Sequence, residues 1–201
     1  TLPASSAASD VYKRQLQIEC FDPHEPFHAP KRFKELFPTN YDGPILDWPI
    51  YDRVKETREE ISELKANYAA LVTMVDEYFG KLLDYFDRYD LWKDTALILT
   101  TDHGFLLGEH DWWAKNRMPV YNEIAHIPLM IYHPDFKNKA GARINSLTQT
   151  IDIMPTFLDF FGLDIPSDVS GNSLQNVLEK DNEIRKALIF GYFGSACNIT
   201  D

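Results

Sequence analysis

A long helical pattern occupies residues 54–86 of the chain. Its apolar side chains recur at spacings of three and four residues, at Ile61, Leu64, Tyr68, Leu71, Val75, Phe79, Leu82 and Phe86. Charged residues fill the other face, which is the arrangement of an amphipathic helix packed on a core. Proline is absent from the segment, and Gly80 is its one weak position. The pattern therefore predicts a single long helix.

Short apolar runs before and after this helix predict strands. The runs cover residues 16–21, 95–101, 129–132 and 187–193, and residues 145–150 predict a shorter strand. Helices are predicted at residues 152–161, with Pro155 in the first turn and Gly162 after the last, and at residues 173–179. Strands that alternate with helices indicate an α/β fold with a mainly parallel sheet, whose ligands bind at the carboxyl ends of the strands.

The composition describes an ordinary globular protein and excludes several partners. Hydrophobic residues make up 44% of the 201 residues and charged residues 25%, and the net charge is −11. Such an acidic chain repels nucleic acid and anionic membranes. A bilayer-spanning helix needs an apolar run of about 18–20 residues, and the sequence contains no run near that length, so no membrane segment is seen. The two cysteines, Cys20 and Cys197, are too few for a disulfide framework, and they leave the compartment open.

The first fifteen residues are predicted to be foreign to the protein. Residues 5–15 read as an in-frame translation of a transposon-type sequencing adapter. We therefore assign residues 1–15 to the adapter and residues 16–201 to one domain. Any export signal of the source gene would lie before Leu16, so localisation is not predicted, although a periplasmic or secreted protein is compatible with the sequence.

Two predicted strands lead into residues that could carry chemistry. The first is followed by Asp22-Pro23-His24-Glu25-Pro26, where the prolines interrupt pairing. The second ends at Asp102-His103-Gly104. A carboxylate beside an imidazole suits a divalent cation, and a glycine lets the backbone turn so that both side chains converge. The tripeptide alone equally fits a capping Asp next to a surface His.

The longer run from Thr100 to Lys115 resembles the sulfatase family of the alkaline phosphatase superfamily. The family pattern is a strand, then Asp-His-Gly or Asp-Asn-Gly, then Gly-Glu/Asp-His and a lysine, which corresponds to Gly108-Glu109-His110 and Lys115 here. Residues 127–132 are similar to the family's next strand, residues 149–156 to its "D-I-x-P-T" helix and residues 22–26 to its "P-H-x-P" loop. The resemblance covers nearly all of residues 16–201.

The resemblance implies an alkaline-phosphatase-like, doubly wound and mainly parallel sheet flanked by helices. It also implies hydrolysis of a sulfate monoester, from a small molecule or a carbohydrate. Asp102 and His103 would bind a divalent metal, usually calcium in this family. Lys115 would contact the sulfate and assist departure of the bridging oxygen, and His24 would hold the sulfate or act as an acid toward that oxygen.

The family's nucleophile is not found in the chain. Sulfatases attack with a formylglycine made from Cys or Ser in a "C/S-x-P/A-x-R" motif, which neither Cys20 nor Cys197 fits. The family's N-terminal Asp-Asp metal pair is also absent. Both features belong to the first half of the family's chain, so we expect the sequence to be a C-terminal piece that lacks the N-terminal half. Expressed alone, it is predicted to be inactive and poorly folded.

Several alternatives stay open. A phosphonate monoester or phosphodiester hydrolase of the same superfamily shares the Asp-His-Gly strand end, and a non-catalytic binding homologue would lack the nucleophile altogether. Outside the motif, Lys115 would be an ordinary solvated lysine and His24 a turn-capping residue. His110 is predicted to form a hydrogen bond rather than bind the metal, and Trp112 and Trp113 to line the core or a pocket wall.

Overall fold

The computed structural model describes residues 14–180, 182–191 and 197–200. Residues 1–13 of the predicted adapter lie outside this range, and Arg14 and Gln15 have no regular secondary structure. The helices are α1 (Lys31–Lys34), α2 (Arg58–Arg88), α3 (Asn122–Ala125), α4 (Ile153–Phe160) and α5 (Gln175–Lys180). The strands are β1 (Leu97–Thr100), β2 (Leu106–Leu107), β3 (Trp113–Ala114), β4 (Leu129–Tyr132), β5 (Leu188–Gly191) and β6 (Cys197–Thr200).

Helix α2 is the predicted long helix, and its first turn is fixed by a reciprocal cap. The Glu60 backbone N–H donates to the Thr57 hydroxyl at 3.2 Å, and the Thr57 N–H donates to the Glu60 carboxylate at 2.7 Å. The two bonds satisfy backbone donors that a helix start otherwise leaves free. The helix therefore begins at Arg58, four residues later than the apolar pattern predicted.

All strand pairings among the described residues are antiparallel. Strand β1 pairs with β4 in a register that places Leu97 opposite Tyr132, and β2 pairs with β3 and β5 with β6. The mainly parallel sheet predicted from the sequence is therefore not found in these pairings. A parallel neighbour needs a crossover, usually a helix. Residues 101–128 contain only short elements between β1 and β4, and the chain returns in the opposite direction.

Two segments that were predicted to be strands are irregular. Residues 16–21 have no regular structure, and Leu16, Ile18 and Phe21 are exposed. Residues 145–149 are also irregular, and Thr150 begins a short 3₁₀ helix. An apolar run forms a strand only when a neighbouring strand accepts its backbone hydrogen bonds, and in the described part of the chain neither segment has such a neighbour.

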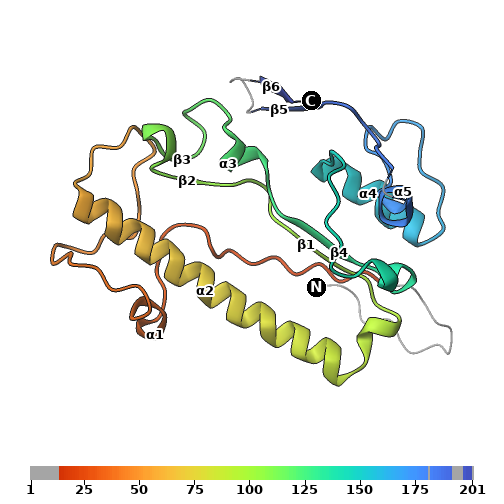
Figure 1. The fold of residues 1–201 in the computed structure, drawn as a ribbon, viewed down its shortest axis with the longest axis horizontal. Coiled ribbons are helices and arrows are strands. Elements are labelled where there is room, and N and C mark those ends of the chain that lie inside the picture. The colour runs from red at the N-terminus through yellow and green to blue at the C-terminus, as the bar shows by residue number, and fades with distance from the viewer. Residues whose placement is uncertain (1–13, 181, 192–196, 201) are drawn as a thin grey trace.

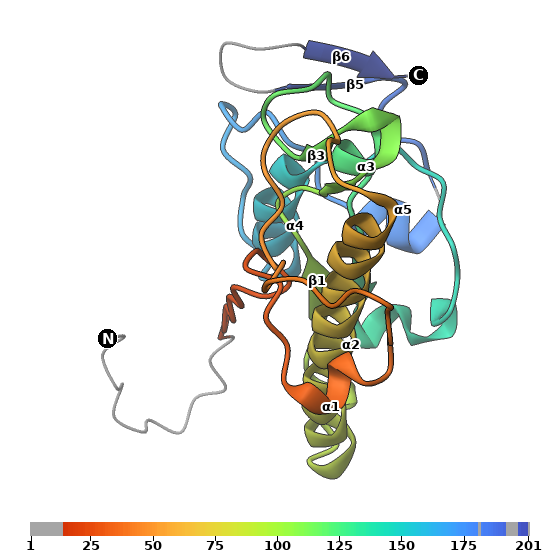
Figure 2. The same cartoon turned by 90° about the vertical axis from the view of Figure 1, so that its left-hand side faces the viewer.

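In Figure 1 the β1–β4 pair lies between α2 on one side and α4 and α5 on the other. Figure 2 shows α1 beside α2, and β5 and β6 at the opposite end of the molecule from α1. In the described ranges, none of the helices combines the length and the apolar character needed to cross a bilayer.

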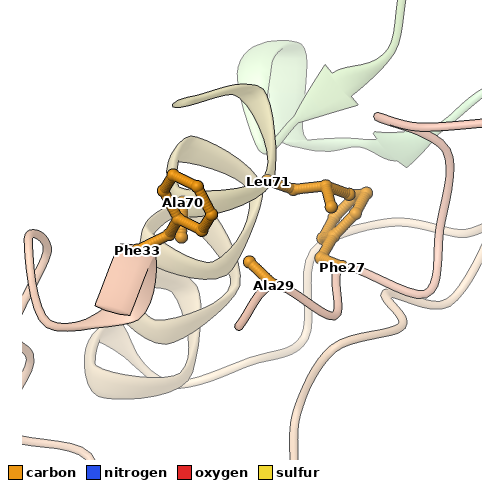
Figure 3. Close-up of a cluster of buried hydrophobic side chains, with 5 residues drawn as sticks. All are labelled: Phe27, Ala29, Phe33, Ala70 and Leu71. Carbon is orange, nitrogen blue, oxygen red and sulfur yellow. The ribbon is translucent and has the colours of Figure 1, made fainter. Parts of the chain in front are cut away.

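The proline-rich loop of residues 22–52 packs across α2 and forms a hydrophobic cluster with it. The members come from α1, from the segment before it and from α2, and are Phe27, Ala29, Phe33, Ala70 and Leu71 (Figure 3). Phe27 is fully buried, and its ring meets the Phe105 ring edge-on at 5.5 Å. Since Phe105 follows Gly104, this contact brings the loop against the end of the β1 segment.

An exposed ion pair reinforces the packing of α1 on α2. The Arg32 guanidinium donates two hydrogen bonds to the Glu77 carboxylate, at 2.5 and 2.8 Å. These bonds, with a further contribution from Lys81, lower the pKa of Glu77 to about 2. Glu77 therefore stays ionised well below neutral pH.

A buried carboxylate organises the region around α4 and α5. Asp152 accepts two hydrogen bonds from the Arg185 guanidinium, one at 2.6 Å, and two more from the backbone N–H groups of Gln149 at 2.7 Å and Asn172 at 2.9 Å. Thr156, one turn later, donates to the Asp152 carbonyl and accepts from the Leu174 N–H. The Asp and Thr of the sequence "D-I-M-P-T" therefore hold segments that are distant in the sequence.

Candidate active site

The structure brings His24 and Lys115 together although 91 positions separate them in the chain. The Lys115 Nζ lies 3.1 Å from His24 Nε2. An ammonium group only donates, so Nε2 accepts this hydrogen bond. His24 Nδ1 lies 2.7 Å from the Glu25 backbone carbonyl, to which it donates. The ring is thus held as the neutral tautomer that carries its proton on Nδ1.

Lys115 is positioned by the buried strand that precedes it. Trp113 and Ala114 of β3 are fully buried, and the Trp113 indole N–H donates to the Glu56 carboxylate at 2.6 Å. The backbone then adopts positive φ angles at Ala114 (69°) and Asn116 (78°), on either side of Lys115. Lys115 itself is only 6% exposed, and its Nζ lies 5.9 Å from the centroid of the Phe105 ring. The interpretation of Lys115 as an ordinary solvated lysine is therefore wrong.

His24 is fixed by a turn and by a ring contact. Its backbone N–H donates to the Phe21 carbonyl at 3.1 Å, and its ring centroid lies 4.5 Å from that of Phe21. The side chain remains 36% exposed. The histidine therefore has a defined orientation while one side of its ring stays open to a ligand.

Asp102 and His103 follow β1 and face each other. His103 Nε2 lies 3.4 Å from Asp102 Oδ2, while Asp102 Oδ1 accepts from the His103 N–H at 2.9 Å and the Thr101 hydroxyl at 3.3 Å. Burial raises the pKa of Asp102, but the charge of His103 and these hydrogen bonds outweigh it, so the net pKa lies below its ordinary value. The carboxylate is thus kept ionised.

Gly104 is required because another backbone passes close to it. A Cβ placed on this residue would lie 1.8 Å from the Glu123 carbonyl oxygen. The Gly104 N–H donates to the Ile124 carbonyl at 2.8 Å. The glycine therefore joins the end of the β1 segment to α3.

The two pairs of residues are linked through Phe105, and among the described residues no hydrogen bond or ion pair joins them directly. Phe105 lies two residues after His103, and its ring lies near the Lys115 ammonium. The structure thus brings His24 and Lys115 into contact, and the Asp102–His103 pair is connected to Phe105 by one intervening residue, Gly104.

The donor atoms of Asp102 and His103 fit part of a cation site. Asp102 Oδ2 and His103 Nε2 are close enough for one ion to contact both, and the carboxylate is 81% exposed. Oxygen and imidazole ligands are common to several divalent metals. Across the described ranges, no three His, Cys, Asp or Glu side chains converge on one point. A cation on this pair would therefore need further ligands other than His, Cys, Asp and Glu side chains of these ranges.

Neighbouring aromatic residues support the site. His110 Nε2 lies 3.1 Å from the Glu123 carboxylate, and its ring stacks on Tyr121 with centroids 3.8 Å apart. The predicted hydrogen-bonding role of His110 is thus confirmed. Trp113 lies in the core and Trp112 packs partly buried against the hydrophobic cluster around Leu106, as predicted, and the Arg53 guanidinium lies over the Trp112 ring at 4.3 Å.

Sequence reasoning missed the carboxylate next to His24. Glu25 is fully buried, accepts a hydrogen bond from the Tyr51 hydroxyl, and places Oε2 3.3 Å from His24 Nδ1. The one signal in the sequence that could have identified Glu25 is its position between His24 and Pro26, in the motif of residues 22–26. Arg185, the partner of Asp152, had no signal of this kind.

Comparison with known proteins places these residues in a family context. A family model described as "Sulfatase" matches residues 16–163. An N-acetylglucosamine-6-O-sulfatase of Bacteroides thetaiotaomicron is 40% identical over 131 residues, which are 63% of this chain and 23% of that protein.

Solved structures of other proteins match the fold of this chain. A protein in complex with its substrate D-glucosamine-2-N,6-O-disulfate matches with a TM-score of 0.61 and 37% identity, over 67% of this chain and 27% of the other. A phosphonate monoester hydrolase of Agrobacterium radiobacter matches in fold, with a TM-score of 0.69 and 24% identity, over 84% of this chain and 39% of the other. The chain spans less than half the length of each of these proteins.

Proposed function

Because the chain belongs to the sulfatase family, we propose that the protein that carries it hydrolyses sulfate monoesters, and that His24 and Lys115 act at the sulfate. The family match and the structural matches confirm the family and the alkaline-phosphatase-like α/β fold predicted from the sequence. We propose the hydrolytic activity, the bound metal and the roles of the individual residues on this basis.

The contact between Lys115 and His24 carries this proposal. Cleavage of a sulfate ester leaves negative charge on the departing oxygen, and a positioned cation or proton donor stabilises it. The buried ammonium of Lys115 has three N–H donors, one of which is used by His24, so others can reach a sulfate oxygen. His24 can give a proton to the leaving oxygen once its Nε2 carries one.

Asp102 and His103 would hold a divalent cation, which is calcium by family resemblance. Such an ion, when bound, supplies positive charge to the non-bridging sulfate oxygens. The residues of this chain would fix its place relative to Lys115 through the short Gly104-Phe105 connection. The nucleophile would be a formylglycine from a motif that the sequence around Cys20 and Cys197 does not match.

The proposed substrate class is a sulfated amino sugar. The support comes from the relative named for N-acetylglucosamine 6-O-sulfate chemistry and from the structure solved with D-glucosamine-2-N,6-O-disulfate. These names belong to those proteins, and both matches extend over about two thirds of this chain or slightly less. A 6-O-sulfate ester has an alcohol leaving group, which needs a proton donor more than a phenol does.

The test is turnover by the complete protein that carries this chain, assayed with glucosamine 6-O-sulfate and with 4-nitrophenyl sulfate. Replacing Lys115 by Ala should lower kcat/KM for both esters by about 100-fold or more, because a donor to the developing charge is lost. Lys137→Ala, which removes an exposed ammonium, should leave both unchanged.

Three outcomes would contradict the proposal. Turnover of a phosphonate monoester in place of both sulfates would assign the protein to the alternative hydrolase activity. Binding of the sulfated sugar without turnover would favour a non-catalytic homologue. An unchanged rate for Lys115→Ala would remove this lysine from the active site.

A further inference from the structure

Glu25 is a buried carboxylate to which the proposed chemistry assigns no role. Its side chain is fully buried, and its Oε1 accepts a hydrogen bond from the Tyr51 hydroxyl. Its Oε2 has no hydrogen-bond partner among the described residues. Buried polar groups normally have partners, and an ionised carboxylate away from water is costly unless a donor or an opposite charge lies close by.

The closest candidate for that charge is the imidazole of the preceding residue. Oε2 lies 3.3 Å from His24 Nδ1, while the Glu25 carbonyl lies 2.7 Å from the same nitrogen. The ring therefore has two acceptors on its Nδ1 side, one neutral and one able to carry charge. While the ring is neutral, its Nδ1–H donates to the Glu25 carbonyl, and Glu25 Oε2 receives no hydrogen bond.

The opposite edge of the ring faces Lys115. The Lys115 ammonium donates to Nε2 in this arrangement, so the ring has no proton to give from that side. Acting as an acid at Nε2 requires the ring to be protonated on both nitrogens. The imidazolium formed in that step would then lie between the Lys115 ammonium and the Glu25 carboxylate. The ammonium repels it, and the carboxylate stabilises it.

We propose that Glu25 is the positioning residue that holds His24 as an imidazolium when it acts as the acid, an inference that rests on the proposed sulfatase activity. When the sulfate enters, a Lys115 N–H turns from Nε2 to a sulfate oxygen, and Nε2 takes up a proton from solvent. Glu25 Oε2 then pairs with Nδ1–H. As the sulfuryl group passes to the nucleophile supplied by the complete protein, the sulfur–oxygen bond to the alcohol breaks and leaves its electron pair on the alcohol oxygen. That oxygen takes the Nε2 proton, and His24 returns to its neutral form.

Tyr51 would orient the carboxylate for this role. Its hydroxyl donates to Oε1 and thereby leaves Oε2 as the oxygen that faces His24. The Tyr51 ring also meets the Phe105 ring edge-on at 6.4 Å, next to the Lys115 ammonium. The four side chains thus form one connected row, from Tyr51 through Glu25 and His24 to Lys115.

The test compares two leaving groups in the complete protein. Acid catalysis matters for an alcohol leaving group and little for 4-nitrophenolate, which departs without a proton. Glu25→Gln keeps the size of the side chain and removes its charge. We expect kcat for glucosamine 6-O-sulfate to fall by about 10-fold or more, and kcat for 4-nitrophenyl sulfate to change by less than about 2-fold.

His24→Gln should show the same selective loss, larger in size. Tyr51→Phe should show a smaller selective loss of kcat for glucosamine 6-O-sulfate. Because this variant keeps Glu25, the test remains valid even if the Glu25→Gln variant does not fold. The matched control is Glu183→Gln, which removes an exposed carboxylate and should change neither rate.

The outcomes separate this role from the sulfatase activity itself. Equal losses on both esters, or no loss on either, would overturn the role of Glu25 while wild-type turnover still supported the proposed function. A wild-type protein that cleaves neither ester would overturn the proposed function, and the role of Glu25 with it.

Discussion

Asp102 and His103 are held in place by bonds to their own neighbours, and this leaves their facing atoms open to a ligand. The backbone N–H of His103 fixes one carboxylate oxygen, and the Gly104 carbonyl lies 2.9 Å from His103 Nδ1. The other carboxylate oxygen and Nε2 then face each other. Such supporting hydrogen bonds orient metal ligands in many proteins.

Asp102→Asn is predicted to weaken divalent-cation binding by the complete protein. The amide keeps the shape of the side chain but loses its negative charge, so we expect the calcium dissociation constant to rise about 10-fold or more. Isothermal titration calorimetry measures this directly. The control is Asp164→Asn, which removes an exposed carboxylate elsewhere. Equal calcium affinities for Asp102→Asn and the wild type would exclude Asp102 as a ligand.

At the residue scale, the candidate residues were chosen from motifs that fix both residue type and spacing. His24 and Lys115 were selected by resemblance, and the structure brings them into contact. Their catalytic roles remain predictions. Glu25 was missed because a sequence gives no sign of burial for a single acidic residue in a loop. Only the packing of Tyr51 against it reveals that this side chain faces inward.

At the scale of secondary-structure elements, the end of the β1 segment is joined to α3 by a close backbone contact. The approach of Gly104 to Glu123 leaves no room for a side chain. The same α3 segment supplies the carboxylate that receives the His110 hydrogen bond. The site therefore depends on how closely these two elements approach.

Gly104→Ala is predicted to destabilise the protein by about 1–3 kcal/mol, because one backbone must move to admit the Cβ. Gly80→Ala is the matched control. Gly80 lies in α2, and a Cβ added there would meet open space among the described residues, so alanine should stabilise the helix by about 0.5–1 kcal/mol. Chemical denaturation of the three proteins measures both changes. Equal stabilities for Gly104→Ala and the wild type would contradict the close contact.

The elements that the sequence predicted best are those with a strong local pattern. Helix α2 and strand β4 were found from periodicity and from a short apolar run, and β4 was predicted at its observed bounds. Residues 16–21 have a comparable apolar run and form no strand. Pairing partners and strand direction depend on distant segments, which a local pattern does not contain.

At the scale of the whole molecule, Asp152 connects three segments that are distant in the sequence. Its carboxylate binds the backbone at Gln149 and Asn172 and the side chain of Arg185. Burial raises the pKa of Asp152, but the bonds from Arg185, Asn172 and Gln149 outweigh it and leave the pKa below its ordinary value. The carboxylate therefore contributes stability only while it is ionised.

Arg185→Met is predicted to lower the free energy of unfolding at pH 7 by about 3–5 kcal/mol, because it leaves a buried charge without its partner. A pKa lowered by folding gives stability that is complete above the unfolded pKa and is lost as the pH falls through the folded one. The difference between variant and wild type should therefore be constant near neutral pH and shrink below about pH 4.

Urea denaturation across this pH range measures the difference, with Arg143→Met, which removes an exposed guanidinium, as the control. A difference that stayed constant down to the lowest pH would show that the ionisation of Asp152 does not contribute.

The contact between His24 and Lys115 also has a consequence for how the protein folds. It closes a loop of 91 positions, and the chain entropy lost in closing a loop rises with its length. Helix α2 lies inside that loop and can form from local bonds alone, whereas the histidine meets the lysine only after residues on both sides of the helix have docked. We therefore expect the pair to form after α2, and a nascent chain acquires its candidate active site only after Lys115 has left the ribosome.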